Sequence, residues 1–231
     1  MIKANARARL TAEDFDFVVR SLSRHQENAV ALADLLIDEE MRDSILDHDV
    51  LVQSLFSVER QLRVSPLLFF YILVRRVLSK AGIQDRDLAD YLASLLEKFM
   101  NTAEMRSPIN KAESGLLYIS DLMIALKEAS PAQTFMLRAH VGNYTLFVTG
   151  LFHENIRQRS ERGAPDCSFY EEMGRMNYRL IAGTTLAKQA QLTKIYETLA
   201  ERFHEVRLAL NALGDSLINL DDDHYATPLI A

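Results

Sequence analysis

The chain has 231 residues, of which 48% are hydrophobic and 25% are charged, and it contains only 8 glycines and 5 prolines. This is the composition of a globular protein long enough to bury a core, and it argues against disorder, turn-rich all-β folds and glycine-rich nucleotide loops. The formal net charge of −6 argues against a general affinity for nucleic acid, because phosphate contacts need a basic face.

Charge is unevenly distributed along the first 80 residues. Residues 11–49 contain eleven acidic residues and three arginines, whereas residues 60–80 contain five basic residues and no acidic one. Such an asymmetry can attract a charged partner, or the two segments can face each other within the fold. We favour the second interpretation.

Several sites have the sequence of a helix start. Thr11 precedes the acidic residues of a first turn, and Ser65 and Ser130 each precede a proline, which is typical of a cap followed by the first helical residue. Ser107 also precedes a proline, but we expect a turn there, because Asn110 has an acidic residue three positions on and is a better cap.

Apolar residues recur at steps of three and four between these caps, which predicts helices over residues 15–22, 30–37, 88–99 and 116–126. No stretch alternates convincingly with the period of two that a half-buried strand requires. We therefore expect an all-α fold, an irregular multi-helix bundle without a sheet.

The pair His48 and Asp49 is of the kind with which metal-dependent phosphohydrolases bind a divalent cation. The sequence offers no convincing further ligands, so we expect a polar turn in which Asp47 or Asp49 caps the next helix. It also lacks a nucleophile elbow, a glycine-rich phosphate loop and a Cys-x-x-Cys pair. We therefore expect no metal and no cofactor, and we favour a protein that is not an enzyme.

Residues 78–92 have the pattern of the first helix and turn of a helix-turn-helix, with Gly82 in the turn. The recognition helix is missing, because the helical pattern continues without a break through residues 93–97. An ordinary helical hairpin is the better interpretation. A nucleic-acid-associated regulator remains our second alternative function, supported by the basic residues alone.

Residues 140–152 are rich in β-branched and aromatic residues, which favour strands. Their apolar positions nevertheless fall at helical steps, and an isolated strand would have no pairing partner in a helical chain. We expect a buried helix in which Gly142 and Gly150 allow a neighbouring helix to approach closely.

The best candidate for a ligand site lies on this helix and at its end. His140 and Tyr144 are one helical turn apart, so they could line a pocket and exchange protons or hydrogen bonds with a ligand. The other candidate pocket residues are Asn143, His153, Glu154 and Arg157. A core histidine and tyrosine followed by a charged helix end explain the same residues without a site. A small-molecule-binding protein or enzyme with this pocket is therefore our first alternative function.

A polar segment at residues 155–168 contains Gly163 and Pro165 and is the best loop or linker in the chain. It divides the sequence into a helical bundle at residues 1–154 and a helical hairpin or long helix at residues 169–231. We expect the two parts to pack as one globular unit.

The strongest pattern is an unbroken heptad repeat of apolar residues in a C-terminal helix that we expect over residues 185–220. Seven of its positions are candidate interface residues: Tyr196, Leu199, Phe203, Val206, Leu210, Leu213 and Leu217. Small and apolar flanking residues favour packing inside a bundle, and a dimer interface is the alternative. The leading function is a helical interaction or scaffold module that engages itself, as a homodimer, or another protein.

The sequence also bears on location. The single cysteine, Cys167, cannot form an intramolecular disulfide, and the first residues contain no continuous apolar stretch of the signal-peptide type. The most apolar run, residues 67–74, is far shorter than the roughly 20 residues that span a bilayer. We expect a cytoplasmic protein without membrane insertion.

Overall fold

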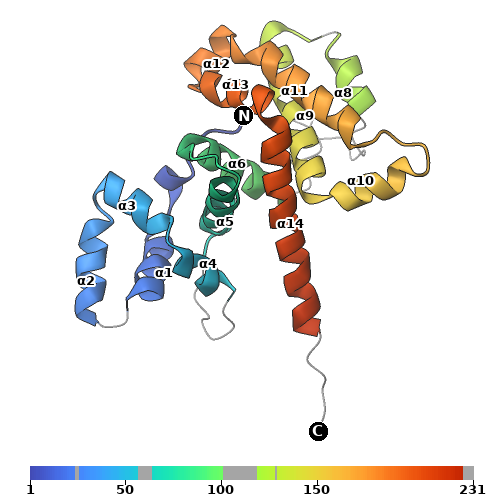
Figure 1. Cartoon of the computed structure of the whole chain (residues 1–231). Coiled ribbons are helices and arrows are strands. Elements are labelled where there is room, and N and C mark those ends of the chain that lie inside the picture. Colours follow the sequence, from blue (N-terminus) through green and yellow to red (C-terminus); the bar gives the residue numbers. More distant parts are fainter. Residues whose placement is uncertain (24–25, 57–63, 101–118, 128, 226–231) are drawn as a thin grey trace. The chain divides into compact units, whose positions relative to one another are not determined.

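The computed structural model describes residues 1–23, 26–56, 64–100, 119–127 and 129–225 (Figure 1). Within these residues the fold is all-α, with thirteen α-helices and no strand, so the predicted class is confirmed. The possible caps at Ser107 and Asn110 lie outside the described residues, as does the start of the helix expected at residues 116–126. None of the helices described combines the length and the apolar composition needed to cross a bilayer.

The chain divides into two compact units, which we call the N-terminal unit, Ala4–Glu97, and the C-terminal unit, Met1–Lys3 with Lys98–Ala231. This division falls in the last turn of a helix. The polar segment at residues 155–168, where the sequence suggests a boundary, lies inside the C-terminal unit, and its first half belongs to a helix, His153–Ser160.

The N-terminal unit begins with a 3-10 turn and continues as six helices. They are η1 (Arg7–Arg9), α1 (Ala12–Leu22), α2 (Gln26–Leu35), α3 (Glu39–Leu46), α4 (Asp49–Leu55), α5 (Pro66–Lys80) and α6 (Arg86–Met100), the last of which ends beyond the unit.

The predicted caps of α1 and α5 are confirmed, and one buried carboxylate joins them. The Thr11 side chain accepts a hydrogen bond from the Asp14 backbone, and the Asp14 carboxylate accepts one from the Thr11 backbone. The same carboxylate accepts hydrogen bonds from the backbone N–H and hydroxyl of Ser65, both at 2.9 Å. Ser65 in turn caps α5, with Pro66 as the first helical residue. Capping contacts thereby also fix the two helix starts to each other.

The turn between α5 and α6 contains Gly82, as predicted. Gly82 has a positive φ of 72°, the Ile83 N–H donates to the Leu78 carbonyl at 2.8 Å, and the Gly82 N–H donates to the Ser79 carbonyl at 3.0 Å. This is the glycine-terminated helix end known as a Schellman motif. Because α6 then runs on to Met100, no separate recognition helix follows the turn.

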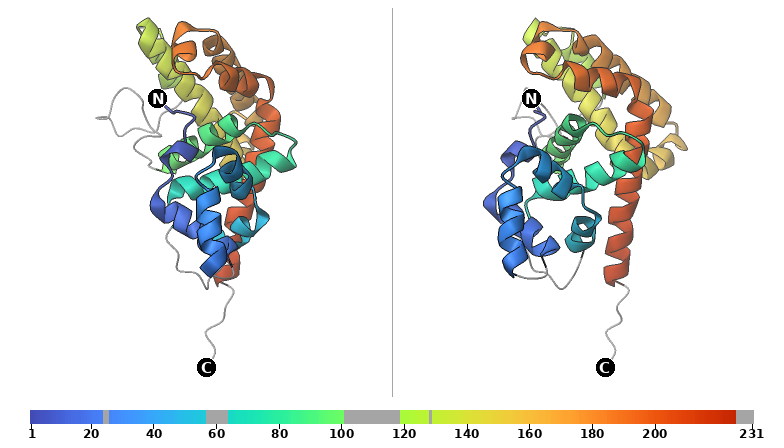
Figure 2. Two further views of the ribbon diagram at one scale, coloured as in Figure 1. Left: turned by 90° about the vertical axis from the view of Figure 1, so that its left-hand side faces the viewer. Right: turned by 60° about the vertical axis from the view of Figure 1, so that its left-hand side comes forward.

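The C-terminal unit contains seven helices in its described part. They are α8 (Ile119–Ala125), α9 (Pro131–Leu151), α10 (His153–Ser160), α11 (Cys167–Ala182), α12 (Thr185–Gln189), α13 (Thr193–Glu201) and α14 (Phe203–Tyr225). Helix α9 is the central element, and both α11 and α14 pack along it (Figure 2). Helix α13 packs mainly on α11.

Residues 140–152 belong almost entirely to α9, so the prediction of a helix rather than a strand is confirmed. The two glycines also act as predicted. A Cβ atom at Gly142 would lie 2.8 Å from the ring of Tyr178 on α11, and one at Gly150 would lie 2.8 Å from Leu210 on α14. Glycine is required at both positions because the neighbouring helix occupies the space of a side chain.

The single long helix expected over residues 185–220 is wrong in detail, because the chain forms three helices there. Helix α12 ends at Gln189, α13 begins at Thr193, and a second break falls at Arg202 between α13 and α14. The heptad repeat continues across the break, since Phe203 and Leu199 are both fully buried. The break lets one apolar stripe contact α11 through α13 and α9 through α14.

Candidate functional site

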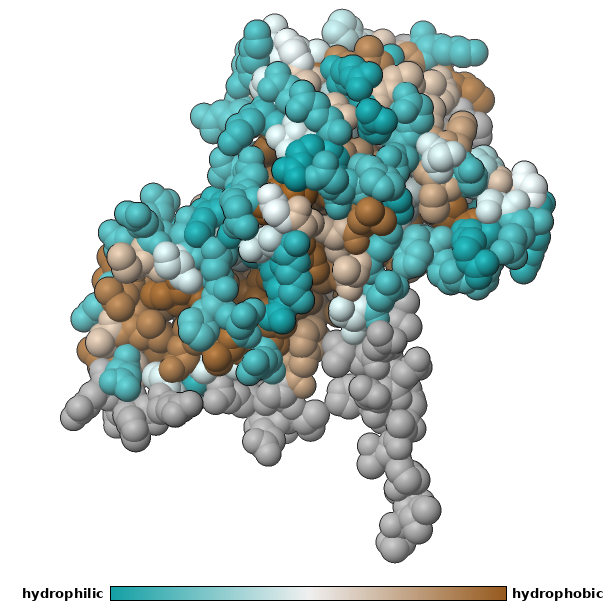
Figure 3. Space-filling model, viewed as in Figure 1, coloured by the Kyte–Doolittle hydropathy of each residue, from teal (hydrophilic) through white to brown (hydrophobic). Residues whose placement is uncertain are grey.

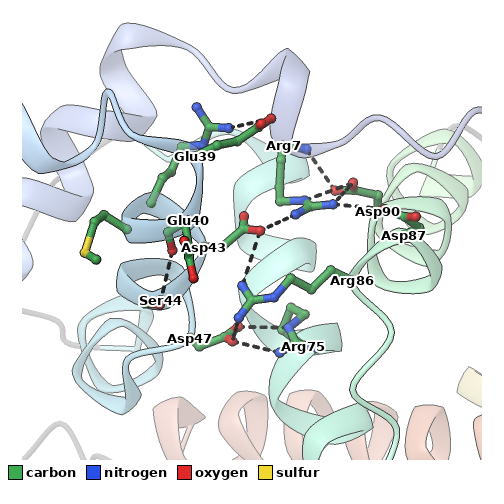
Figure 4. Close-up of polar contacts among 12 residues, drawn as sticks. Arg7, Glu39, Glu40, Asp43, Ser44, Asp47, Arg75, Arg86, Asp87 and Asp90 are labelled. Carbon is green, nitrogen blue, oxygen red and sulfur yellow. Dashed lines mark hydrogen bonds and ion pairs between the residues drawn. The ribbon is translucent and has the colours of Figure 1, made fainter.

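A cluster of alternating charges joins four segments of the N-terminal unit (Figure 4). Its basic residues come from η1, α5 and α6, and its acidic residues from α3, the residue after α3, and α6. The members are Arg7, Asp43, Asp47, Arg75, Arg86, Asp87 and Asp90. We call this set the charged cluster.

Arg7 is at one end of the charged cluster. Its backbone N–H and its Nε donate to the two carboxylate oxygens of Asp90 at 2.9 and 3.0 Å. Its Nη1 donates to Asp43 at 2.6 Å, and its Nη2 donates to Asp87 at 3.1 Å. One arginine before α1 therefore connects α3 with α6.

Asp47 is at the other end and binds two arginines. Arg75 donates to its two oxygens from Nε and Nη2 at 2.8 and 2.7 Å, which is the bidentate geometry of a strong charge-assisted pair. Arg86 Nη2 lies 2.9 Å from the same carboxylate, and Arg86 Nη1 lies 3.5 Å from Asp43. The Asp43 carboxylate thus links the two ends of the cluster.

Burial shifts the ionisation of the groups around Arg7. Burial raises the pKa of Asp90, although its contacts with Arg7 act in the opposite direction. Burial also raises the pKa of Tyr71. For Arg7 itself, burial alone would lower the pKa, but the hydrogen bonds to Asp90 and Asp43 outweigh it and the net change is upward. Arg7 therefore remains charged.

The arrangement of the cluster is suited to holding helices together. Each of its four carboxylates faces at least one guanidinium group, and arginine neither ligates a metal nor releases its proton at ordinary pH. In the described part of the chain, no group of three or more His, Cys, Asp or Glu side chains is placed to hold a metal ion.

Two ion pairs made by α5 explain part of the charge asymmetry in the sequence. Arg75 pairs with Asp47, and Arg76 pairs with Asp49 at 2.7 Å, so two bases of residues 60–80 face acids of residues 11–49. For these two arginines the intramolecular interpretation is confirmed. Arg60 and Arg63 lie outside the described residues.

A pocket of about 280 Å³ opens beside Asp47, between the end of α3, the start of α4 and the second half of α5. Its lining includes the buried apolar side chains of Leu46 and Ile72 and the basic side chains of Arg75, Arg76 and Lys80. Sequence reasoning missed this pocket, because residues 46–52 and 72–80 are brought together by tertiary packing, including that of α4 on α5.

His48 lines the same pocket and caps α4. The prediction that Asp47 or Asp49 caps this helix is wrong, because the His48 side chain accepts the hydrogen bond of the Val50 N–H at 3.2 Å. The two carboxylates are instead bound by arginines. A helix cap needs only an acceptor, and the nearby arginines compete for the stronger acceptors.

The candidate pocket residues on α9 lie in or near the core of the C-terminal unit. His140 is buried with its ring 5.7 Å from that of Phe99, and Asn143 is buried and accepts a hydrogen bond from the Tyr178 hydroxyl at 2.7 Å. Tyr144 is half-buried, and burial raises its pKa. His140 and Asn143 are packed against aromatic rings of the core.

The other three candidates belong to the first turns of α10. Glu154 and Arg157 are exposed and form a bidentate pair at 2.6 and 2.9 Å, which lowers the pKa of Glu154 to about 2. His153 Nε2 lies 3.7 Å from Asp215 on α14. Glu154 and Arg157 are thus paired on the surface of one helix, whereas His140 and Asn143 are buried in α9.

The candidate interface residues of the heptad stripe form the core of the C-terminal unit. The first six, from Tyr196 to Leu213, are at most 2% exposed, and only Leu217 is half-buried. Tyr196 stacks on Tyr178 of α11 with the ring centres 5.6 Å apart. A partner could reach these side chains only if α13 and α14 left α9 and α11.

An exposed apolar surface lies instead on α2 and at the start of α3. Val30 is 62% exposed and Ile37 79% exposed, and Leu35 and Met41 are also exposed. Figure 3 shows apolar side chains gathered over the helices of the N-terminal unit around α2. We call these four residues the apolar face. The signal in the sequence is that α2 has apolar residues all round and a low charge, which is typical of a buried helix.

Cys167 is the first residue of α11, where it is half-buried. Burial raises the pKa of its thiol, and the neighbouring Asp166 acts in the same direction. A raised pKa leaves little thiolate at neutral pH, so this cysteine is a poor nucleophile.

Three features of the described residues are therefore candidates for function: the charged cluster, the pocket between α4 and α5, and the apolar face of α2 and α3. Each is defined by its own geometry and chemistry. Comparisons of the chain with models of protein families, with curated proteins and with solved structures give no match.

Proposed function

We propose that the chain is a helical protein-interaction module and that its N-terminal unit binds a basic, amphipathic segment of another protein through the apolar face. The observation that carries this proposal is the exposure of four large apolar side chains on one short stretch, Val30 to Met41. Large apolar side chains that are exposed together are typical of interaction surfaces.

The packing of α2 supports this proposal. Within the N-terminal unit α2 packs mainly on α1, and its remaining sides carry Val30, Ala31, Ala33 and Leu35, all exposed. A helix that is apolar all round is normally covered on all sides. Binding of a partner would remove this apolar surface from water, which is the main favourable contribution to most protein association.

The charges around the apolar face indicate the chemistry of the partner. Residues 26–47 contain seven acidic residues and one basic residue, Arg42. Asp34, Asp38, Glu39 and Glu40 are exposed beside the apolar side chains. Complementary charge favours a partner with lysine or arginine around its apolar residues. A second copy of the chain would bring two acidic rims together, which disfavours self-association through this face.

The test uses two synthetic amphipathic helices with the same leucine stripe, one with lysine and one with glutamate on the polar face. We expect the lysine peptide to bind the full chain and the glutamate peptide not to bind. Replacing Val30 and Ile37 by serine should weaken binding of the lysine peptide at least about tenfold, because central apolar contacts dominate such interfaces. Isothermal titration calorimetry measures both effects.

The matched control is Leu208→Ser, which removes an apolar side chain of α14 that is 48% exposed outside the apolar face. This variant should bind the lysine peptide like the unmodified chain. Equal binding of both peptides, or equal loss in both variants, would contradict the proposal. A dimer in light scattering that the Val30→Ser/Ile37→Ser variant converts to a monomer would show that a second copy occupies the face.

A further inference from the structure

The pocket between α4 and α5 collects the basic residues of one face of α5. Five residues of this helix line it, at spacings of three and one that place them on a single stripe: Ile72, Arg75, Arg76, Ser79 and Lys80. Together with Asp47 and Asp49, which line the same pocket, these residues give the lining three positive and two negative charges. The excess is positive in a protein whose net charge is −6.

The two acidic residues differ in how strongly they are held. Asp47 is bound by Arg75 and Arg86, so its negative charge is shared between two guanidinium groups. Asp49 has a side chain that is 79% exposed, and it contacts Arg76 at the surface. Exposed pairs of this kind contribute little and exchange readily with other anions. Another anion can therefore replace Asp49 in the ion pair with Arg76.

Further donors surround this position. Lys80 ends α5 and is exposed, with no ion pair among the residues that the structure describes. The Val50 N–H donates to His48 Nδ1, so the proton of the neutral ring lies on Nε2, which remains a donor. The Ser79 hydroxyl accepts from Gln84 at 3.2 Å and keeps its own proton to donate.

We propose that this pocket binds a small phosphate monoester, whose charged oxygens replace Asp49 on Arg76 and contact Lys80. The volume of about 280 Å³ is just below the range of roughly 300–1,000 Å³ for ligand pockets, which suits a small monoester rather than a dinucleotide. The apolar side chains of Leu46 and Ile72 in the lining accommodate the carbon part of the ligand. This site shares no residue with the apolar face, and the proposal does not depend on the proposed function.

Phenyl phosphate is the probe, and amide chemical shifts of the ¹⁵N-labelled full chain measure its binding. We expect it to shift the amides of residues 48–52 and 75–80, and we expect benzyl alcohol, which lacks the charge, not to do so. Replacing Arg76 and Lys80 by glutamine should weaken binding about tenfold, since charge-assisted hydrogen bonds to the phosphate are lost.

Asp49→Asn gives a prediction of opposite sign. Because it removes the competing carboxylate and leaves Arg76 in place, it should tighten phenyl phosphate binding about threefold. If the pocket were only a solvated depression with surface ion pairs, Asp49→Asn and the unmodified chain would not differ in their affinity for phenyl phosphate. Asp49 and Lys80 are exposed, so neither substitution removes a core contact.

Lys188→Gln on α12 is the matched control, because it removes an exposed lysine of the other unit. The Lys188→Gln variant should bind phenyl phosphate as tightly as the unmodified chain does. Unchanged or weaker binding in Asp49→Asn, equal loss in Lys188→Gln, or the absence of shifts around the pocket would each overturn the proposal.

A phosphate monoester group is found both on soluble metabolites and on lipid headgroups. Sedimentation with phosphatidylcholine vesicles, with and without phosphatidic acid, distinguishes the two sources. Co-sedimentation that requires phosphatidic acid, Arg76 and Lys80 would assign the site to a lipid headgroup. Binding of phenyl phosphate without co-sedimentation would assign it to a soluble monoester.

Discussion

Arg7 makes more long-range polar contacts than any other residue described in the N-terminal unit. It binds Asp90, Asp43 and Asp87, which lie 36 to 83 positions away in the sequence. The Asp90 side chain is only 5% exposed. A buried carboxylate that loses its cation keeps the full cost of leaving water, which is larger than the net gain from forming the pair.

We expect Arg7→Ala to lower the free energy of unfolding by about 3 kcal/mol, because it leaves Asp90 buried without its cation. Urea denaturation followed by circular dichroism measures the change. Arg157→Ala, which breaks an exposed pair on α10, is the control and should leave the urea midpoint unchanged. Equal effects of the two substitutions would show that the charged cluster contributes no more than a surface pair.

The loss in Arg7→Ala should also depend on pH. Burial raises the pKa of Asp90 above its ordinary value of 3.8, and Arg7→Ala removes the guanidinium contacts that oppose this rise while keeping the backbone hydrogen bond. The folded variant then binds a proton that the unfolded chain releases, so its stability falls as the pH rises above 3.8. The difference between variant and unmodified chain should therefore shrink toward pH 4, and a constant difference would contradict this explanation.

At the scale of elements, α9 shows how small residues position neighbouring helices. Gly142 faces the ring of Tyr178, and this ring cannot move away easily. It is fully buried, its hydroxyl donates to Asn143, and it stacks on Tyr196. Helix α11 thus approaches α9 more closely at this point than any side chain on Gly142 would permit.

We expect Gly142→Ala to lower the free energy of unfolding by about 2 kcal/mol, because the added methyl group would lie 2.8 Å from the Tyr178 ring and force α9 and α11 apart. Thermal denaturation measures it. Gly183→Ala is the matched control, since a Cβ there has open space and no positive φ. A destabilised Gly183→Ala, or an unaffected Gly142→Ala, would show that the contact does not limit the packing.

At the scale of the whole molecule, the chain consists of two units, each with its own apolar core. The N-terminal unit also contains the charged cluster, whereas the core of the C-terminal unit lies between α9, α11, α13 and α14. Proteins with more than one compact unit commonly open unit by unit rather than all at once.

Hydrogen exchange under native conditions should therefore separate the two units. We expect Arg7→Ala to accelerate amide exchange across α3, α5 and the first turns of α6, with no change in α9 and α11. Gly142→Ala should accelerate exchange in α9 and α11, with no change in α3, α5 and the first turns of α6. Acceleration of both units by either substitution would show that they unfold as one cooperative structure.

Some parts of the fold were predictable because they depend on neighbours in the sequence. Thr11, Ser65 and Ser130 cap helices through residues three positions on, and the spacing of apolar residues distinguishes helix from strand at residues 140–152. Much less of the site was predictable. His140 and Tyr144 share a helix face, but the sequence does not say what packs against that face.

The all-α class and these caps could be read from the sequence alone, since both follow from local periodicity and backbone chemistry. The need for glycine at positions 142 and 150 depends instead on Tyr178 and Leu210, which the packing of α11 and α14 brings against α9. Only the tertiary structure decided that α13 ends at Glu201, that the heptad stripe is core, and that the apolar face of α2 remains exposed. These outcomes depend on which helices meet. An apolar stripe looks the same in a sequence whether its neighbour belongs to the same chain or to a partner.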